Sequence, residues 1–274
     1  MMRSPGGRRS TLSAEAAERM IVVGGRVALG FALLAAWQFY PNLFDMNPFW
    51  LSQPSLVLEK ALELYAGGRL VGAIGVTVLE TVLGLGLGCI VGVGIGVLLG
   101  LFRAFREVFE PFLLIANAFP KIAMAPLFMI WFGIGLAMKV AIAFSLVVVV
   151  MALSTYSGMR TVRQELVNYA RVCGATEAQI FGKIVIPSVA PWLFAGFRVS
   201  VTFALIGAVL GEFIAAQDGL GYMIDGGMAS FDSSLVFLCL VLLLILVWVV
   251  NATMEWIGHR FGIREDSPTT GYNS

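Results

Sequence analysis

Five ionisable side chains stand out inside long apolar runs of this 274-residue sequence, because a charge there is costly and marks a function or an ion pair. They are Arg26, Glu80, Lys121, Arg198 and Glu212. Lys121 is the deepest, at about nine residues or roughly 14 Å into its run. Its ammonium group needs a partner, which is either an anionic solute on a permeation path or a fixed carboxylate or carbonyl group. Met124 and Trp131 are further candidates for that path, although apolar packing is their commoner role.

The other four charges lie near the ends of their apolar runs, where a structural role is favoured. Arg26 and Arg198 are about five or six residues from an end, so their long side chains can reach the membrane surface. Glu80 and Glu212 lie near the opposite ends, where pairing or hydration is easy. Glu212 also remains a candidate for the permeation path.

Hydrolytic, metal and nucleotide chemistry have no recognisable machinery in the sequence. The phosphate-binding motif G-x-x-x-x-G-K-[ST] does not occur, so we do not expect the chain to hydrolyse ATP. His259 is the only histidine, and the motif H-E-x-x-H is absent. Cys89, Cys173 and Cys239 are too far apart to suggest a disulfide framework or a metal cluster. No enzyme activity, bound cofactor or metal is expected.

The composition is that of an integral membrane protein. Hydrophobic residues make up 59% of the chain and charged residues 13%, against about 25% charged in soluble domains. A formal net charge of +1 offers no field to attract nucleic acid. Pro120 and Pro126 make the third apolar run irregular. The runs predict an all-α fold with six membrane-spanning helices, at about 21–39, 74–102, 112–132, 138–158, 192–216 and 234–257.

The basic residues outside these runs predict the orientation of one membrane domain, 21–260, between two tails, 1–20 and 261–274. Twelve fall on one side: Arg3, Arg8, Arg9, Arg19, Arg103, Arg106, Arg160, Arg163, Arg171, Lys183, Arg260 and Arg264. Three fall on the other: Lys60, Arg69 and Lys139. The bias predicts that both tails are cytoplasmic.

Two loops on the predicted outer side have distinct compositions. Segment 54–65 alternates apolar and charged residues at helical spacing, which predicts a short helix on the membrane surface. Loop 217–233 carries Asp218, Asp225 and Asp232 without Lys or Arg. We favour simple solvation of these aspartates over contact with a basic partner.

Glycines that recur every four residues in the second run predict close helix packing. They are Gly84, Gly88, Gly92, Gly96 and Gly100. Each step of four residues over-rotates an ideal helix by about 40°. The glycine ridge should therefore wrap, either contacting more than one helix or crossing one helix steeply.

The loop between the fourth and fifth runs, about 160–190, is long for a connection. Two amphipathic stretches, 161–173 and 176–185, are separated by Gly174, which predicts two short helices. Two prolines should end the second helix: Pro187 and Pro191. Such helices could dock in a groove of another protein or rest on lipid headgroups. One face should gather Val162, Leu166, Tyr169, Ala170 and Cys173.

This loop resembles the signature loop of binding-protein-dependent ABC importer permeases, whose pattern is roughly E-A-A-x-x-x-G-A-x(5)-F-x-x-I-x-x-P. The matching residues are Ala170, Gly174, Ala175, Phe181, Ile184, Ile186, Pro187, Pro191, Gly196 and Arg198. Asn168 and Tyr169 stand where the pattern has Glu and Ala, and Glu80 stands where relatives often carry Arg. The nitrate, sulfonate and taurine branch is similar at FPKIAMAPLFMIWFGIG (119–135), GEFIAA (211–216) and GLGYMI (219–224). The resemblance covers about 72–260.

The resemblance implies a type I ABC importer permease in a bacterial inner membrane. Its partners would be a second copy of the chain, two ATPase subunits that bind ATP and Mg, and an external solute-binding protein. The loop would couple to the ATPase through Asn168, Tyr169, Ala170, Cys173, Gly174, Ala175, Phe181 and Pro187. The solute would be a small organic anion such as a sulfonate, a taurine-like compound or an aromatic carboxylate. Nitrate or a pyrimidine-type nutrient is the alternative.

An ion-gradient-driven secondary transporter is the main competing function. Such proteins are commonly built from inverted repeats and bind coupling ions near the middle of the membrane. The sequence shows no convincing repeat, and its intramembrane carboxylates lie near the ends of the apolar runs.

Overall fold

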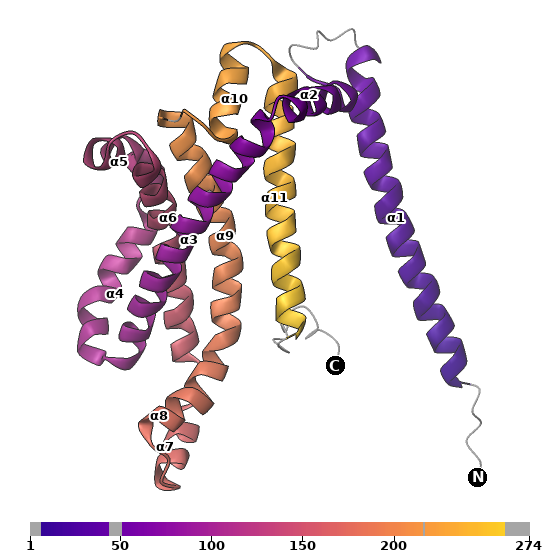
Figure 1. Ribbon diagram of the computed structural model, residues 1–274. Coiled ribbons are helices and arrows are strands. Elements are labelled where there is room, and N and C mark those ends of the chain that lie inside the picture. Colours follow the sequence, from indigo (N-terminus) through magenta and orange to yellow (C-terminus); the bar gives the residue numbers. More distant parts are fainter. Residues whose placement is uncertain (1–6, 44–50, 216, 261–274) are drawn as a thin grey trace.

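The computed structural model describes residues 7–43, 51–215 and 217–260, whose regular elements are all helices (Figure 1). For residues 7–19, Asn42, Ile257 and His259 it describes the backbone alone. The elements are α1 (Gly7–Leu43), α2 (Pro54–Ala66), α3 (Arg69–Leu101), α4 (Arg103–Ala118), η1 (Lys121–Met124), α5 (Ala125–Phe132), α6 (Leu136–Arg160), α7 (Gln164–Val172), α8 (Glu177–Ile180), η2 (Phe181–Val185), α9 (Ile186–Ala215), α10 (Leu220–Ala229) and α11 (Ser233–Arg260). The predicted tail 261–274 lies outside the described residues.

Among the described residues, five helices are long and apolar enough to cross a membrane, and a bent pair could form a sixth crossing. The six-span prediction is therefore confirmed, with one correction. The predicted helix 112–132 breaks after Ala118, and the two halves meet at 86°. Pro120 causes the break because it lacks an N–H group and forces Phe119 into an extended conformation (φ −68°, ψ 134°).

The ends of the bundle carry different elements, which we call the upper and lower ends as drawn in Figure 1. The upper end holds α2, α5 and α10. The lower end holds α7 and α8, together with the start of α1 and the end of α11. The short helix predicted over 54–65 is present as α2, which lies at the top of the bundle.

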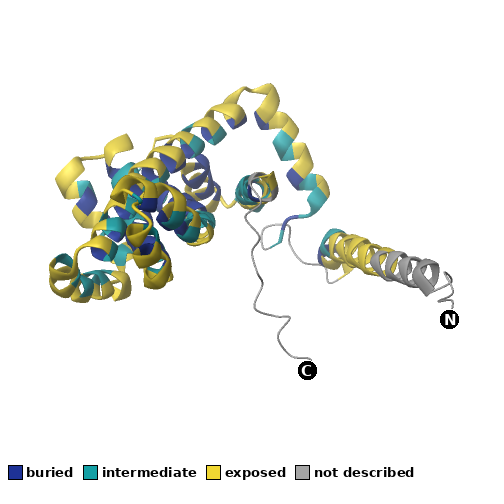
Figure 2. Cartoon of the chain, turned by 90° about the horizontal axis from the view of Figure 1, so that it is seen from below, coloured by how far each residue is buried: buried dark blue, intermediate teal, exposed yellow. Residues whose placement is uncertain are grey.

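Helices α3, α6 and α9 form the packed centre, whereas α1 stands apart from it (Figures 1 and 2). The apolar part of α1, Met20–Pro41, is almost entirely exposed. Its described side-chain hydrogen bonds run to the segment before α2 and to its first turn. Trp37 Nε1 donates to the Ser52 carbonyl at 2.7 Å, and Gln38 Nε2 donates to Ser55 at 3.0 Å.

The glycine ridge of α3 packs against α6 along its whole length. A Cβ added at Gly88 would lie 2.6 Å from Val147, and one at Gly100 would lie 2.5 Å from Met159. The residues of α6 that meet the ridge also recur every four positions: Ala143, Val147, Met151, Thr155 and Met159. Because both helices share a period longer than 3.6 residues, they can wind around each other with a right-handed twist. The nearest atoms at each ridge glycine belong to α6, so among the described residues the ridge follows a single helix, whereas the sequence left open contact with several helices or a steep crossing of one.

A second set of glycines, which was not predicted from the sequence, brings α9 against α6. Gly196 faces Ser154, Gly207 faces the backbone of Ala143, and Gly211 faces Lys139. Ala143 therefore sits between Gly84 of α3 and Gly207 of α9, where no larger side chain fits.

Candidate functional site

The lower loop, residues 161–185, contains two short helices. The first, α7, ends at Val172, and the second, α8, begins at Glu177. Gly174 has φ +82°, and its N–H donates to the Arg171 carbonyl at 3.0 Å. The Ala175 N–H donates to the Ala170 carbonyl at 3.0 Å, which completes a Schellman motif at the end of α7. Thr176 and Gln179 then form a capping box that begins α8. The angle between the two predicted helices is thus fixed by backbone hydrogen bonds.

The second helix of the lower loop does not end at the prolines, contrary to the sequence expectation. From α8 the chain passes through the π-helical turn η2 directly into α9, so Glu177–Ala215 forms one long helical span. The Ile186 N–H donates to the Phe181 carbonyl, five residues back, just before Pro187. A wider turn at this point accommodates a residue that cannot donate to the helix ladder.

The five apolar residues expected on one face of the lower loop divide between two faces. Val162 is buried and Ala170 half-buried, and they pack with the buried Val167, Ile180 and Val185. The other three are exposed: Leu166, Tyr169 and Cys173. Sequence periodicity could not separate the faces because apolar residues occur on both. The exposed row gives the lower loop an apolar outer surface, to which Val172 adds a side chain that is 87% exposed.

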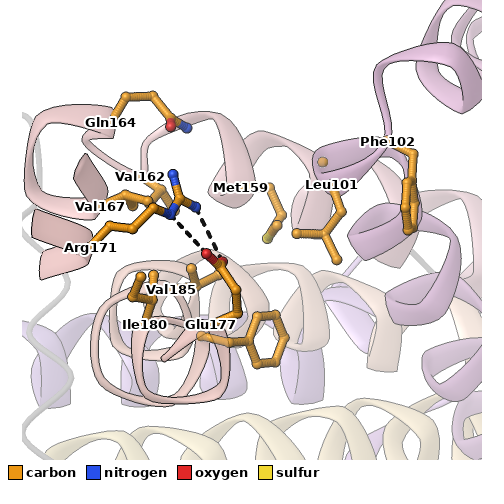
Figure 3. Close-up of a pocket in the computed structure, with 12 residues that line it drawn as sticks. Leu101, Phe102, Met159, Val162, Gln164, Val167, Arg171, Glu177, Ile180 and Val185 are labelled. Atoms are coloured by element: carbon orange, nitrogen blue, oxygen red, sulfur yellow. Dashed lines mark hydrogen bonds and ion pairs between the residues drawn. The ribbon is translucent and has the colours of Figure 1, made fainter. Parts of the chain in front are cut away.

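A groove of about 640 Å³ lies between the lower loop and the turn that joins α3 to α4 (Figure 3). Its walls include Leu101, Met159 and Phe181, with the ion pair of Arg171 and Glu177 at one side. Arg171 Nε donates to Glu177 Oε1 at 2.8 Å, and its Nη2 donates to Oε2 at 3.2 Å. This bidentate ion pair connects α7 to α8, although an exposed ion pair stabilises a folded protein by only about 1 kcal/mol or less.

The remaining residues predicted for the lower loop are accessible. Asn168, Gly174 and Pro187 are exposed, and Ala175 is half-buried against the apolar cluster. Most of the predicted loop residues thus lie on one small unit at the lower end. The two departures from the loop pattern, Asn168 and Tyr169, are on its outside.

Lys121 lies at the bend between α4 and α5, in the short helix η1. It is half-buried and makes no ion pair with any described residue. A fixed carboxylate partner, one of the two interpretations of this lysine, is therefore absent from the described part of a single copy. Met124 packs against a cluster that contains Phe128, whereas Trp131 is exposed and meets the Phe128 ring edge-on at 5.8 Å.

Glu212 does not lie on an open surface. It belongs to a buried group at the upper end, the upper cluster, formed by Thr77, Glu80, Lys139, Glu212 and Gly221. Lys139 Nζ donates to Glu80 Oε1 at 2.5 Å. Thr77 Oγ1 donates to Glu212 Oε1 at 2.7 Å, and the Gly221 N–H donates to Glu212 Oε2 at 2.6 Å. The carboxylate of Glu212 thereby caps the N-terminus of α10.

The upper cluster explains why the segment 211–224 has glycines at positions 219 and 221. Gly219 has φ +116°, and a Cβ there would collide with the Glu212 carboxylate. A Cβ on Gly221 would lie 2.7 Å from the Val209 carbonyl and 2.8 Å from Glu212 Cβ. The two glycines let α10 approach close enough for its first N–H groups to reach buried oxygen atoms.

Two features at the upper end were not predicted from the sequence. Lys139 was counted as a loop charge, yet its side chain is buried in α6. The composition of 217–233 predicts a solvated loop, whereas the structure shows helix α10 there, and Asp232 after it pairs with Lys60 at 3.0 Å. The available signal was that three apolar runs carry charges of both signs near the same predicted end. Arg198, by contrast, takes the structural role expected of it and pairs with Glu255 of α11 at 2.9 Å.

A bundle of membrane-crossing helices with a bent third crossing and a protruding lower loop defines a multi-pass transport subunit. The chain belongs to the family described as "Binding-protein-dependent transport system inner membrane component", whose match spans residues 84–263. It is therefore an ABC transporter permease.

Curated relatives agree with this assignment, and a solved structure shares the fold. The chain is 32% identical over 211 residues to the riboflavin transport system permease RibX of Chloroflexus aurantiacus, covering 77% of this chain and 79% of that one. It is 25% identical over 233 residues to the taurine transport system permease TauC of Escherichia coli, covering 83% and 85%. An inward-facing structure of the MetNI methionine ABC transporter shares the fold, with a TM-score of 0.63 over 73% of this chain and 98% of the matched chain, at 21% identity.

Proposed function

We propose that two copies of this chain form the translocation path of an ATP-driven importer. In this proposal, two separate ATPase subunits bind ATP and Mg at the lower end, and an external binding protein delivers the solute at the upper end. The lower end is then cytoplasmic, with both chain termini, in a bacterial inner membrane. Support comes from the described basic residues, because Arg103, Arg106, Arg160 and Arg163 all belong to the lower end, whereas Lys139 is not a loop charge at all.

The single observation that carries the proposal is the outer surface of the lower loop. Leu166, Tyr169 and Val172 are 50%, 71% and 87% exposed, on a unit whose backbone is held by a Schellman motif and a capping box. A rigid apolar projection at one end of a permease fits a groove in a partner protein. Because the same unit continues into α9, displacement of the docked loop would move a membrane-spanning helix directly.

The docking proposal is tested by comparing Leu166→Asp with Glu165→Gln in the complex purified from its native host. Both positions are exposed on α7, but only Leu166 belongs to the apolar row. We expect Leu166→Asp to lose the copurifying ATPase or its transport-coupled ATP hydrolysis, and Glu165→Gln to keep both. Equal behaviour of the two variants would contradict docking through this face. Uptake driven by an ion gradient without an ATPase subunit would favour a secondary transporter.

We further propose that the solute is a small organic anion such as a sulfonate, a taurine-like compound or an aromatic carboxylate. Lys121 supports this proposal because its half-buried ammonium group has no ionic partner among the described residues, and TauC is named for taurine. If uptake depends on a positive charge at position 121, the lysine attracts the solute. Lys121→Met should reduce taurine or sulfonate uptake strongly, while Lys121→Arg keeps much of it.

A second solute class follows from RibX, which is named for riboflavin and is the more identical of the two relatives. Nitrate and pyrimidine-type nutrients are further candidate solutes. Competition assays with taurine, an alkanesulfonate, nitrate, riboflavin and a pyrimidine separate these classes. Inhibition by riboflavin alone, with no effect of Lys121→Met, would overturn the anion proposal.

A further inference from the structure

The upper cluster contains an unequal number of opposite charges, and all three charged side chains are almost fully buried. Glu80 and Glu212 are each 1% exposed, and Lys139 is 5% exposed. Two ionised carboxylates and one ammonium group would leave a net negative charge buried among apolar helices. Such a charge is strongly disfavoured unless another positive charge compensates it.

One oxygen atom of the cluster has no donor. Glu80 Oε1 accepts the hydrogen bond from Lys139, but Oε2 is buried and has no hydrogen-bond partner among the described residues. Glu80 lies one helical turn from Thr77 on α3, and the Thr77 hydroxyl donates to Glu212 Oε1 at 2.7 Å, so the two carboxyl groups share one buried group. Two ionised carboxylates side by side present only acceptor atoms, so a hydrogen atom between them would make their proximity favourable.

We infer that the upper cluster is a binding site for one proton, carried by Glu80 and donated in a hydrogen bond to Glu212. The cluster is then neutral, because the ionised Glu212 balances Lys139. Glu212 remains the ionised member because Thr77 and the Gly221 N–H both donate to it. Glu80 keeps its hydrogen bond from Lys139 through Oε1 and gains a donor at Oε2.

Other polar groups near the cluster do not supply the missing charge. A cavity of about 300 Å³ borders Glu80 and Lys139 and is also lined by Gln217 and Asp218, which are exposed. Asp218 would add a negative charge, and Cys239 of α11 is a free thiol, which cannot carry a positive charge. The bound proton therefore joins α3, α6 and α9 at the upper end and, through Glu212, secures α10.

The matched variants Glu80→Gln and Glu80→Met test the inference on the full chain purified in detergent. Gln reproduces a protonated glutamic acid, since its oxygen accepts from Lys139 and its amide group donates to Glu212. Met has a similar length but can do neither. We expect Glu80→Gln to unfold at a temperature close to that of the wild type and Glu80→Met to unfold several degrees lower. An equal loss in both variants would overturn the inference, because the negative charge would then be required.

Two readouts separate a bound proton from a merely well-packed polar group. Folding that takes up a proton makes the wild type less stable as pH rises. The unfolding temperature of the wild type should therefore fall relative to that of Glu80→Gln between about pH 5 and about pH 9. The infrared absorption of a protonated carboxyl group, shifted in heavy water, should be present in the wild type and absent in Glu80→Gln. Parallel pH profiles, a missing band, or a stability that depends on sodium instead would contradict the proton site.

Discussion

Gly92 of α3 lies directly against the backbone of Val148 in α6, so that a Cβ at position 92 would be only 2.6 Å from the Val148 carbonyl oxygen. A carbonyl oxygen in a helix cannot turn aside as a flexible side chain can. The two helices must therefore separate if position 92 carries any side chain. Gly94, two residues later, has no atom within 4 Å of the corresponding position.

Gly92→Leu is predicted to destabilise the bundle, and Gly94→Leu serves as its matched control. Overpacking of a tight contact costs about 1–3 kcal/mol, whereas an exposed helical glycine can be replaced without loss. Thermal unfolding in detergent, followed by loss of the monodisperse species, measures the difference. If both variants unfold at the same temperature, the close α3–α6 contact is wrong.

Gly174→Val should impair the lower loop much more than Gly174→Asn. A β-branched residue is strained at φ +82°, whereas Asn tolerates the left-handed region, and no neighbouring atom restricts space at this position. The expected cost of Val is about 1–3 kcal/mol of local strain, with a corresponding loss of ATPase-coupled transport. Transport assays of the two variants at equal expression check this. Equal loss of transport in both variants would mean that docking requires the absence of a side chain at position 174. The positive φ angle of Gly174 would then not be the cause.

Asp232 has two separable roles at the upper end. Its Oδ2 pairs with Lys60 of α2 at 3.0 Å, and its Oδ1 accepts the Leu235 N–H at the start of α11 at 3.0 Å. Asp232→Asn removes the charge but keeps the cap, so it should cost about 1 kcal/mol or less. Asp232→Ala also removes the cap and should cost about 0.5–2 kcal/mol more. Thermal unfolding of both variants distinguishes the two contributions, and equal losses would mean that the cap contributes nothing.

The same pair should be insensitive to pH in the physiological range. The hydrogen bond from Lys60 to Asp232 raises the pKa of the Lys60 ammonium group above its ordinary value. A raised lysine pKa gives stability that is complete below the unfolded value of about 10.4 and is lost as pH rises through the folded value. The difference between the wild type and Lys60→Met should therefore stay constant from about pH 6 to about pH 9, and a change within that range would contradict this assignment.

The positions of the membrane crossings could be predicted because each is a local property of about 20 residues. The glycine ridge and the hinge at Gly174 were also visible, since both depend on spacing along one segment. The faces of α7 could not be assigned, because Val167 and Leu166 are equally apolar and only contact with α8 and α9 buries one of them.

The upper cluster could not be predicted from the sequence for a different reason. Glu80, Lys139 and Glu212 are separated by 59 or more residues, and their contact depends on how three helices are aligned. A charge near the end of an apolar run has the same appearance whether it is hydrated or paired. The sequence therefore places Lys139 among the loop charges. It also does not predict the short helix α10, because the glycines that let this helix pack closely have a low helix propensity.

The continuous helical span from Glu177 to Ala215 links the lower loop to the upper cluster. Its 39 residues correspond to roughly 58 Å at 1.5 Å per residue. Ile180 anchors one end in the lower loop, and Glu212 holds α10 at the other. The π-helical turn η2 carries the chain past Pro187 without ending the helix, so a displacement of the lower loop would reach the upper end through one continuous element. Between the two ends, the close contact of Gly207 with the backbone of Ala143 holds this element against α6.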